Sequence, residues 1–184
     1  EGTAPASLSA AIVAAGRDPA TRAVLATTFL GGVATAIVIL YQVPVMVTAG
    51  LTLAVASSLA GARGFMQLGG RIPMPRLVDR FGSRTTLRGA HLLTGVSCLV
   101  LPFAGVLPVA VVFAVVAGLA IGALVPVESI FTADIISTDS LGVVLGVASL
   151  ARGIGSALGP VLGGVLASGV GSRTPTLAVA AGLT

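Results

Sequence analysis

Charged, aromatic and metal-binding side chains are all scarce in this chain of 184 residues. It has no lysine and no tryptophan, one cysteine at Cys98 and one histidine at His91. A single cysteine excludes an intrachain disulfide and a metal site built from several cysteines. The sequence offers no Ser/His/Asp, Cys/His or metal-ligand set, which argues against an enzyme. We therefore expect no catalytic residues, no bound metal and no cofactor.

Charged residues make up 9% of the chain, whereas soluble domains carry about 25%. The chain is 55% hydrophobic and its mean hydropathy is +1.09. A helix needs about 20 apolar residues to cross a bilayer, and residues 23–62 contain no charge. The pattern predicts an all-α, polytopic membrane helix bundle with five full spans and a partial sixth. The expected spans are residues 23–47, 51–72, 87–104, 107–127, 141–168 and 174–184.

Residues 1–22 form a polar segment, rich in small residues, before the first expected span. The segment contains Arg17 and Arg22, and Pro19 marks a boundary just before the span. We interpret it as a cytoplasmic linker or an interfacial helix. The chain begins at Glu1 and not at a methionine, and it stops within an apolar run. We therefore expect it to be part of a longer protein.

All ten basic residues are arginines, and their distribution predicts an orientation. Two precede the first span and five cluster between the second and third, whereas the connections near 48–50 and 105–108 are uncharged. Arg173 is a single exception on the other side. Because cytoplasmic loops carry an excess of Lys and Arg, we expect this side to face the cytoplasm, in a plasma membrane or a bacterial inner membrane. The arginines then contact lipid headgroups and not nucleic acid. The cluster comprises Arg71, Arg76, Arg80, Arg84 and Arg88.

Two short sequence patterns occur twice in the chain. Val-Pro-Val closes the first span at residues 43–45 and the fourth at residues 125–127. Ala-Arg-Gly lies in the second span at residues 62–64 and in the fifth at residues 151–153. This recurrence is consistent with two inverted three-span units. Tripeptides of common residues also recur by chance, so both interpretations stay open.

The segment 71–84 is the only dense charge cluster in the chain. Gly82 can adopt a positive φ, which allows a tight reversal between two helices. Asp79 can accept hydrogen bonds at a helix start, where negative charge is favoured, and Arg80 and Arg84 can pair with acids or phosphates. We expect residues 76–84 to form a tight loop. A loop that only sets the topology is the alternative.

The fifth span contains a string of glycines and one proline. Gly155, Gly159 and Gly163 fall four residues apart, so they share one helix face, and Gly164 follows directly. Such a face allows another helix to approach closely, and Pro160 removes a backbone hydrogen bond and bends the helix. The string therefore predicts close helix packing, or a point that bends or seals.

These two motifs resemble those of the major facilitator superfamily of secondary transporters. Residues 75–84 resemble its cytoplasmic loop, apart from Pro75, where the family usually has Gly, and Ser83, usually basic. The glycine and proline string is similar to its antiporter motif. The resemblance implies a bundle half with a 3+3 inverted repeat. The fourth span lacks the Arg common in amino-terminal halves, so we expect the carboxyl-terminal half, spans seven to twelve, with the last incomplete.

Polar residues within the spans are the candidates for the solute cavity. The resemblance implies that Arg63 contacts an anionic substrate or a buried acid. The residue one turn before it is Leu59, so an acid partner must come from elsewhere. Arg152 is a weaker candidate, with an ion pair to Glu128 or snorkelling as alternatives. We expect Glu128 to pair with Arg80 or Arg84 and so to close the cytoplasmic end. The full cavity set is Arg63, Gln42, Gln67 and Arg152. For Gln42 and Gln67, a hydrogen bond between helices is the alternative to lining the cavity.

The gate set is Arg71, Asp79, Arg80, Gly82, Arg84 and Glu128. We expect His91 to be a satisfied interfacial group and not a proton relay. No acid is expected deep within a span, so a carboxylate that binds a coupling proton is expected in the other half.

The resemblance implies secondary active transport of a small solute by alternating access, with an anionic or carboxylate substrate or drug efflux as the candidates. The expected partners are the lipid bilayer, the amino-terminal half, a small-molecule substrate and, as a candidate coupling ion, the proton. A structural or partner-binding membrane subunit and, less favoured, a membrane-embedded enzyme remain as alternatives.

Overall fold

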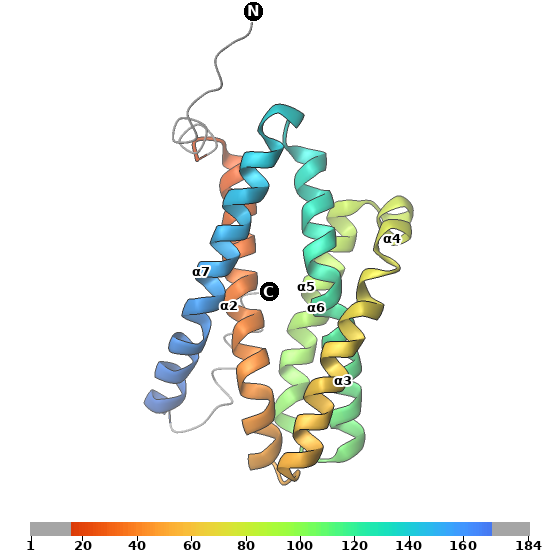
Figure 1. Cartoon of the computed structure of the whole chain (residues 1–184), viewed down its shortest axis with the longest axis vertical. Helices are drawn as coiled ribbons and strands as arrows, with labels where there is room; N and C mark the ends of the chain where they lie inside the picture. Colours follow the sequence, from red (N-terminus) through yellow and green to blue (C-terminus); the bar gives the residue numbers. More distant parts are fainter. Residues whose placement is uncertain (1–15, 171–184) are drawn as a thin grey trace, which may run out of the picture.

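The structure, a computed structural model, describes residues 16–170, and this part of the chain contains helices and no strands. Figure 1 shows the long helices side by side in one elongated bundle. The elements are α2 (Pro19–Thr48), α3 (Leu53–Arg71), α4 (Met74–Phe81), α5 (Ser83–Val100) with the 3-10 turn η1 (Leu101–Phe103), α6 (Leu107–Ile135) and α7 (Thr138–Val170).

The five long helices lie where the first five spans are expected. By length and composition, four described segments could cross a membrane: α2, α5 together with η1, α6, and residues 140–165 of α7. The helix α3 has 19 residues but is less apolar than these four segments, so it is not among the candidate membrane spans. The sixth expected span, 174–184, lies outside the described residues.

The helix α2 begins within the segment that we expected to be a linker. Asp18 caps it, because its carboxylate accepts hydrogen bonds from the backbone N–H and the hydroxyl of Thr21, both at 2.8 Å. These hydrogen bonds lower the pKa of Asp18. Pro19 is the first helical residue, a position where its missing N–H costs nothing. The expected linker 1–22 therefore overlaps α2 by four residues, 19–22.

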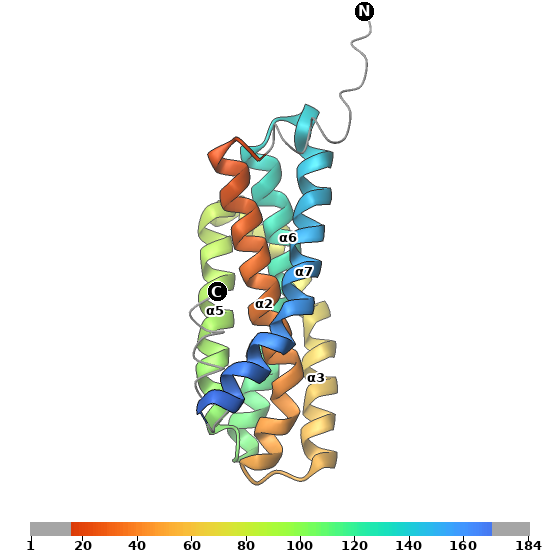
Figure 2. The same cartoon turned by 90° about the vertical axis from the view of Figure 1, so that its left-hand side faces the viewer.

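The bundle consists of two closely packed groups of helices. One group is the pair α2 and α7; in the other, α3 and α5 both pack on α6. Figures 1 and 2 show α7 along α2, and α6 beside α3 and α5. Many large apolar side chains point outward, including Phe65, Leu92 and Val161, as expected of surfaces in contact with lipid tails.

Glycines bring the helix backbones together in both groups. A Cβ atom added at Gly155 or Gly159 would lie closer than 3.0 Å to the backbone of α2 at Phe29 or Val33. The expected glycine face on α7 is therefore confirmed at these two positions. Pro160 lies inside α7, and its carbonyl accepts a hydrogen bond from the Tyr41 hydroxyl at 3.5 Å.

The sequence analysis missed a second glycine contact, between α6 and α3. A Cβ at Gly118 would meet the backbone of Arg63, and one at Gly122 would meet the backbone of Gln67. The signal is present in the sequence, because residues 118 and 122 are one turn apart in an apolar helix. Backbone approach of this kind lets helices associate in lipid, where apolar burial alone gives little driving force.

The expected tight loop at residues 76–84 is wrong, because most of it is helical. The helix α4 buries Met74, while Arg76, Asp79 and Arg80 lie on its exposed side. Asp79 occupies the last turn of α4 and not the start of a helix; the first turn of α5 has no side-chain cap. This amphipathic pattern explains why a helix forms where the charge density pointed to a loop.

The chain reverses between α4 and α5 at one residue, Gly82, with φ 80° and ψ 152°. This confirms the expected positive φ, and the region is accessible almost only to glycine. We expect Gly82→Ala to lower the free energy of unfolding by about 1–3 kcal/mol. Thermal unfolding of the full protein in detergent measures this.

The matched control is Gly89→Ala, seven residues further along on α5. Gly89 is exposed in a helix interior, and a Cβ there would meet nothing within 4 Å. Alanine at such a position stabilises a helix by up to about 1 kcal/mol. Equal effects of the two substitutions would contradict the assigned backbone at Gly82.

Candidate functional site

Four polar side chains that can carry a binding function are buried in the bundle: Gln42, Arg63, His91 and Glu128. Arg63 is 6% exposed, His91 7% and Glu128 8%. Charged groups are costly in the interior of a membrane protein and mark functional positions. Together with the half-buried Arg152, they form two groups, one around Arg63 and one around Glu128.

The first group joins α2 to α3. Arg63 donates from Nε to Oε1 of Gln42 at 2.8 Å, and Gln42 donates in turn to the carbonyl of Ile39 at 3.0 Å. The bond orients the guanidinium group but leaves its Nη1 atom buried and without a partner. Within the described part of the chain, Arg63 makes no ion pair with an acid. The expected polar contact of Gln42 between helices is confirmed.

The second group joins α6 to α7. The Oε2 atom of Glu128 forms an ion pair with Arg152. This was one of the alternatives for Arg152, and the expected pairing of Glu128 with Arg80 or Arg84 is wrong. The physical reason is helix length: α6 continues to Ile135, so Glu128 lies roughly two turns inside the helix. From there it faces Arg152 and not the arginines at the surface.

The helix α5 adds His91 to the second group. Its Nε2 atom lies 3.6 Å from Oε1 of Glu128, beyond hydrogen-bond length, and neither ring nitrogen has a hydrogen-bond partner. The Oε1 atom of Glu128 also lacks a hydrogen-bond partner among the described residues. Leaving such a buried group unsatisfied costs about 1–3 kcal/mol. His91 is therefore not the satisfied interfacial group that we expected.

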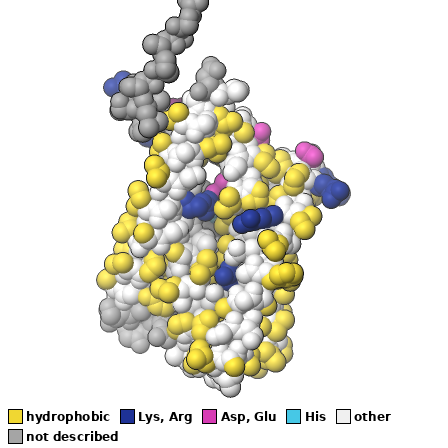
Figure 3. Space-filling view, viewed as in Figure 1, with side chains coloured by type: hydrophobic (Ala, Val, Ile, Leu, Met, Phe, Trp, Pro, Cys, Tyr) yellow, Lys and Arg dark blue, Asp and Glu magenta, His cyan; other side chains and the backbone are white. Residues whose placement is uncertain are grey.

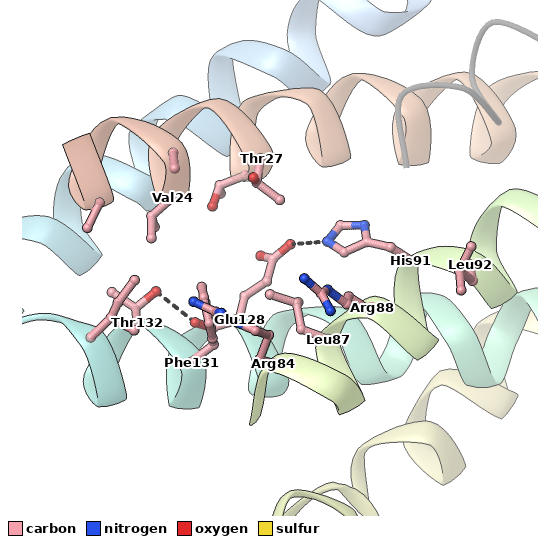
Figure 4. Close-up of a pocket in the computed structure, with 14 residues that line it drawn as sticks. Val24, Thr27, Arg84, Leu87, Arg88, His91, Leu92, Glu128, Phe131 and Thr132 are labelled. Carbon is pink, nitrogen blue, oxygen red and sulfur yellow. Dashed lines mark hydrogen bonds and ion pairs between the residues drawn. The ribbon is translucent and has the colours of Figure 1, made fainter. Parts of the chain in front are cut away.

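A cavity of about 790 Å³ lies beside Glu128, between α2, α5 and α6. Figure 4 shows the Glu128 carboxylate pointing toward the His91 ring, with Arg84 and Arg88 on the same helix as His91. Thr27 and Thr28 of α2 contribute to the opposite wall. A smaller pocket of about 50 Å³ is lined by Glu128 together with Arg152. Glu128 thus lines two pockets.

The remaining candidates lie outside these groups. Gln67 is half-buried on α3, while Arg71, Asp79 and Arg80 are exposed near α4. Arg84 is exposed and lines the cavity. Figure 3 shows basic side chains together with an acidic one in the middle of the face between α2 and α6. No group of three His, Cys, Asp or Glu that could hold a metal occurs among residues 16–170.

The two polar groups occupy corresponding places in the chain. Gln42 and Glu128 each lie roughly two turns before the end of a long helix, next to Val-Pro-Val. Each contacts the arginine of an Ala-Arg-Gly tripeptide in the next long helix, Arg63 or Arg152. The helices α2 and α6 run in opposite directions (Figure 1). The two groups therefore lie toward opposite ends of the bundle.

The site could have been recognised more fully from helical spacing. Residues 84, 87, 88 and 91 fall on one face of α5 and all line the cavity, as do residues 128 and 132 of α6. Periodicity does not reveal which helices pack together, however, and the packing of the helices decides the partners of Glu128. Chemically, the arrangement offers buried positive charge, one buried carboxylate and an imidazole. These groups bind ions, protons or polar solutes without covalent chemistry.

A family model described as Major Facilitator Superfamily matches residues 23–184. No curated protein matches the chain. The match covers both polar groups and all of the long helices except the first four residues of α2.

Proposed function

The chain belongs to the major facilitator superfamily, whose members are membrane transporters, and we propose that it serves in secondary active transport of a small anionic solute. The observation that carries this proposal is Arg63, a buried guanidinium group without an acidic partner in the described part of the chain. Its Nη1 atom is a free donor for a carboxylate or a similar anion.

The chemistry of Arg63 favours an anion over a cation or a neutral drug. An isolated buried cation is unfavourable, and an anion that approaches it regains the lost electrostatic energy. The planar guanidinium group donates in parallel to carboxylate oxygens. Gln42 occupies Nε, which holds the group in place and leaves its far side for the solute.

The rest of the architecture is consistent with alternating access. We interpret the corresponding polar groups on α2–α3 and α6–α7 as the products of a 3+3 inverted repeat. The chain would then be the carboxyl-terminal half, with the solute bound where it meets the amino-terminal half. The exposed charged residues of the gate set would contact that half at the cytoplasmic end; they are Arg71, Asp79, Arg80 and Arg84.

A counterflow assay tests the proposed substrate class. The full-length protein is reconstituted in proteoliposomes loaded with unlabelled mono- or dicarboxylates, amines or neutral sugars, and exchange of the same labelled compound is measured. We expect exchange of carboxylates to exceed exchange of amines or neutral sugars at least about tenfold, because a tenfold preference needs only about 1.4 kcal/mol; protein-free liposomes give the background. Exchange of amines or lipophilic cations alone would favour drug efflux and contradict the proposal. Absence of any exchange would favour a non-transporting subunit.

A further inference from the structure

We propose that His91 and Glu128 form a proton-binding site, and that a proton on His91 draws the Glu128 carboxylate away from Arg152 and loosens the contact between α6 and α7. The inference concerns a different residue group from the solute site at Arg63. Its tests need no solute, so it can fail or succeed independently of the proposed substrate.

The geometry of the carboxylate supports an exchange of partners. Its two oxygens face two different helices: Oε2 pairs with Arg152 of α7, and Oε1 faces His91 of α5 at 3.6 Å. Oε1 and the imidazole Nε2 both lack hydrogen-bond partners in the described part of the chain. Closing the gap by about 0.5 Å gives a normal N–H···O hydrogen bond once Nε2 carries a proton.

The charges around His91 act in opposite directions on its protonation. Burial and the positive charge of Arg152 oppose a charged imidazole, while the Glu128 carboxylate favours it. On α5, Arg84 and Arg88 also line the cavity and add positive charge from exposed positions. The helix α2 contributes no charge to the cavity, only alanine, valine and threonine side chains. Without the proton, the ion pair with Arg152 has no competitor. With it, a second cation competes with Arg152 for the same carboxylate, which weakens the ion pair.

Protons can reach the site from one end of the bundle. The cavity of about 790 Å³ is lined by the first turns of α2 and α5 and the last turns of α6, all at the arginine-rich end. His91 and Glu128 both line this cavity, whereas Arg152 lines only the smaller pocket. The proton donor and the displaced arginine thus face different oxygens of the carboxylate.

The corresponding group at the other end of the bundle lacks this property. There Gln42 takes the place of the carboxylate, and an amide does not titrate. The sensitivity to pH is therefore confined to one of the two groups. Acidification should act on the contact between α6 and α7 and leave the contact between α2 and α3 unchanged.

A distance measurement between α6 and α7 tests the proposal. Spin labels are placed at the exposed positions Ala133 and Gly142 of the full-length protein in lipid nanodiscs, and their distance distribution is recorded from pH 8 to pH 5. We expect a longer-distance population that grows as pH falls, by up to tenfold per pH unit for a single proton. His91→Gln should abolish this dependence.

Two further variants complete the experiment. Arg76→Gln removes an exposed cation of α4 and should retain the full pH dependence. Glu128→Gln leaves Arg152 unpaired and can impair folding. The double variant Glu128→Gln/Arg152→Gln keeps the local charge balanced and is compared instead. It should show no pH dependence. Unchanged pH dependence in His91→Gln, or none in the wild type, would overturn the proposal.

Discussion

Replacing Arg63 with glutamine is expected to reduce uptake of the anionic solute by about 100-fold while the protein stays folded. A hydrogen-bonded contact to a charged group contributes roughly 1.5–3 kcal/mol, and about 3 kcal/mol corresponds to 100-fold. Glutamine retains a polar group near Gln42, and removing an unpaired buried cation does not destabilise the bundle. Initial uptake rates in proteoliposomes over a range of solute concentrations measure the loss.

Two further variants show whether Arg63 acts through direct contact. Gln42→Ala removes the bond that orients the guanidinium group, and it should weaken uptake less than Arg63→Gln does. Arg76→Gln, an exposed arginine on α4, should leave solute affinity unchanged. If Arg63→Gln retained the kinetics of the wild type, Arg63 would be a structural residue and the substrate class would lose its support.

Replacing Gly155 with leucine is expected to prevent stable folding of the bundle. A Cβ at this position would meet the backbone of α2 at Phe29 and Val33, which cannot yield as a flexible side chain can. Overpacking typically costs about 1–3 kcal/mol, and separating two helix backbones costs more because it also breaks neighbouring contacts. Size-exclusion chromatography in detergent should show little monodisperse protein. The milder Gly155→Ala and Gly159→Ala should lower the unfolding midpoint.

The matched control lies two residues away on the same helix. Gly153 is exposed, and a Cβ there would meet nothing within 4 Å. Gly153→Leu should therefore yield folded protein in normal amounts. Similar losses in Gly153→Leu and Gly155→Leu would indicate that leucine anywhere in this segment is harmful, which would contradict the assigned packing of α7 on α2.

Local patterns in the sequence predicted much of the fold. Each of the five long helices overlaps a long apolar run of the sequence, because hydropathy and helix length are properties of a single segment. The spacing of Gly155 and Gly159 predicted a packing face for the same reason. Gln42 was expected to line the cavity or bond between helices, and it bonds Arg63, the other candidate polar group in the facing helix.

Patterns within a single segment could not predict which distant helices pack together. Glu128 was assigned to the arginines at the surface because α6 was expected to end at residue 127; it continues to Ile135 and carries the carboxylate toward Arg152. The role of His91 depends on three helices meeting at one point. The helix α4 was mistaken for a loop because charge density outweighed its amphipathic spacing.

The close approach of α2 and α7 has a consequence for how the protein is made. Tyr41 and Pro160, which touch in the folded bundle, are 119 residues apart in the chain. Ribosomes add about 5–20 residues per second, so α2 waits roughly 6–24 s for its main partner. During that time the side of α2 that α7 covers, which includes Gly32, lacks this partner. Early assembly must therefore rely on α3, α5 and α6, and a chaperone or insertase that shields α2 would have its greatest effect in this interval.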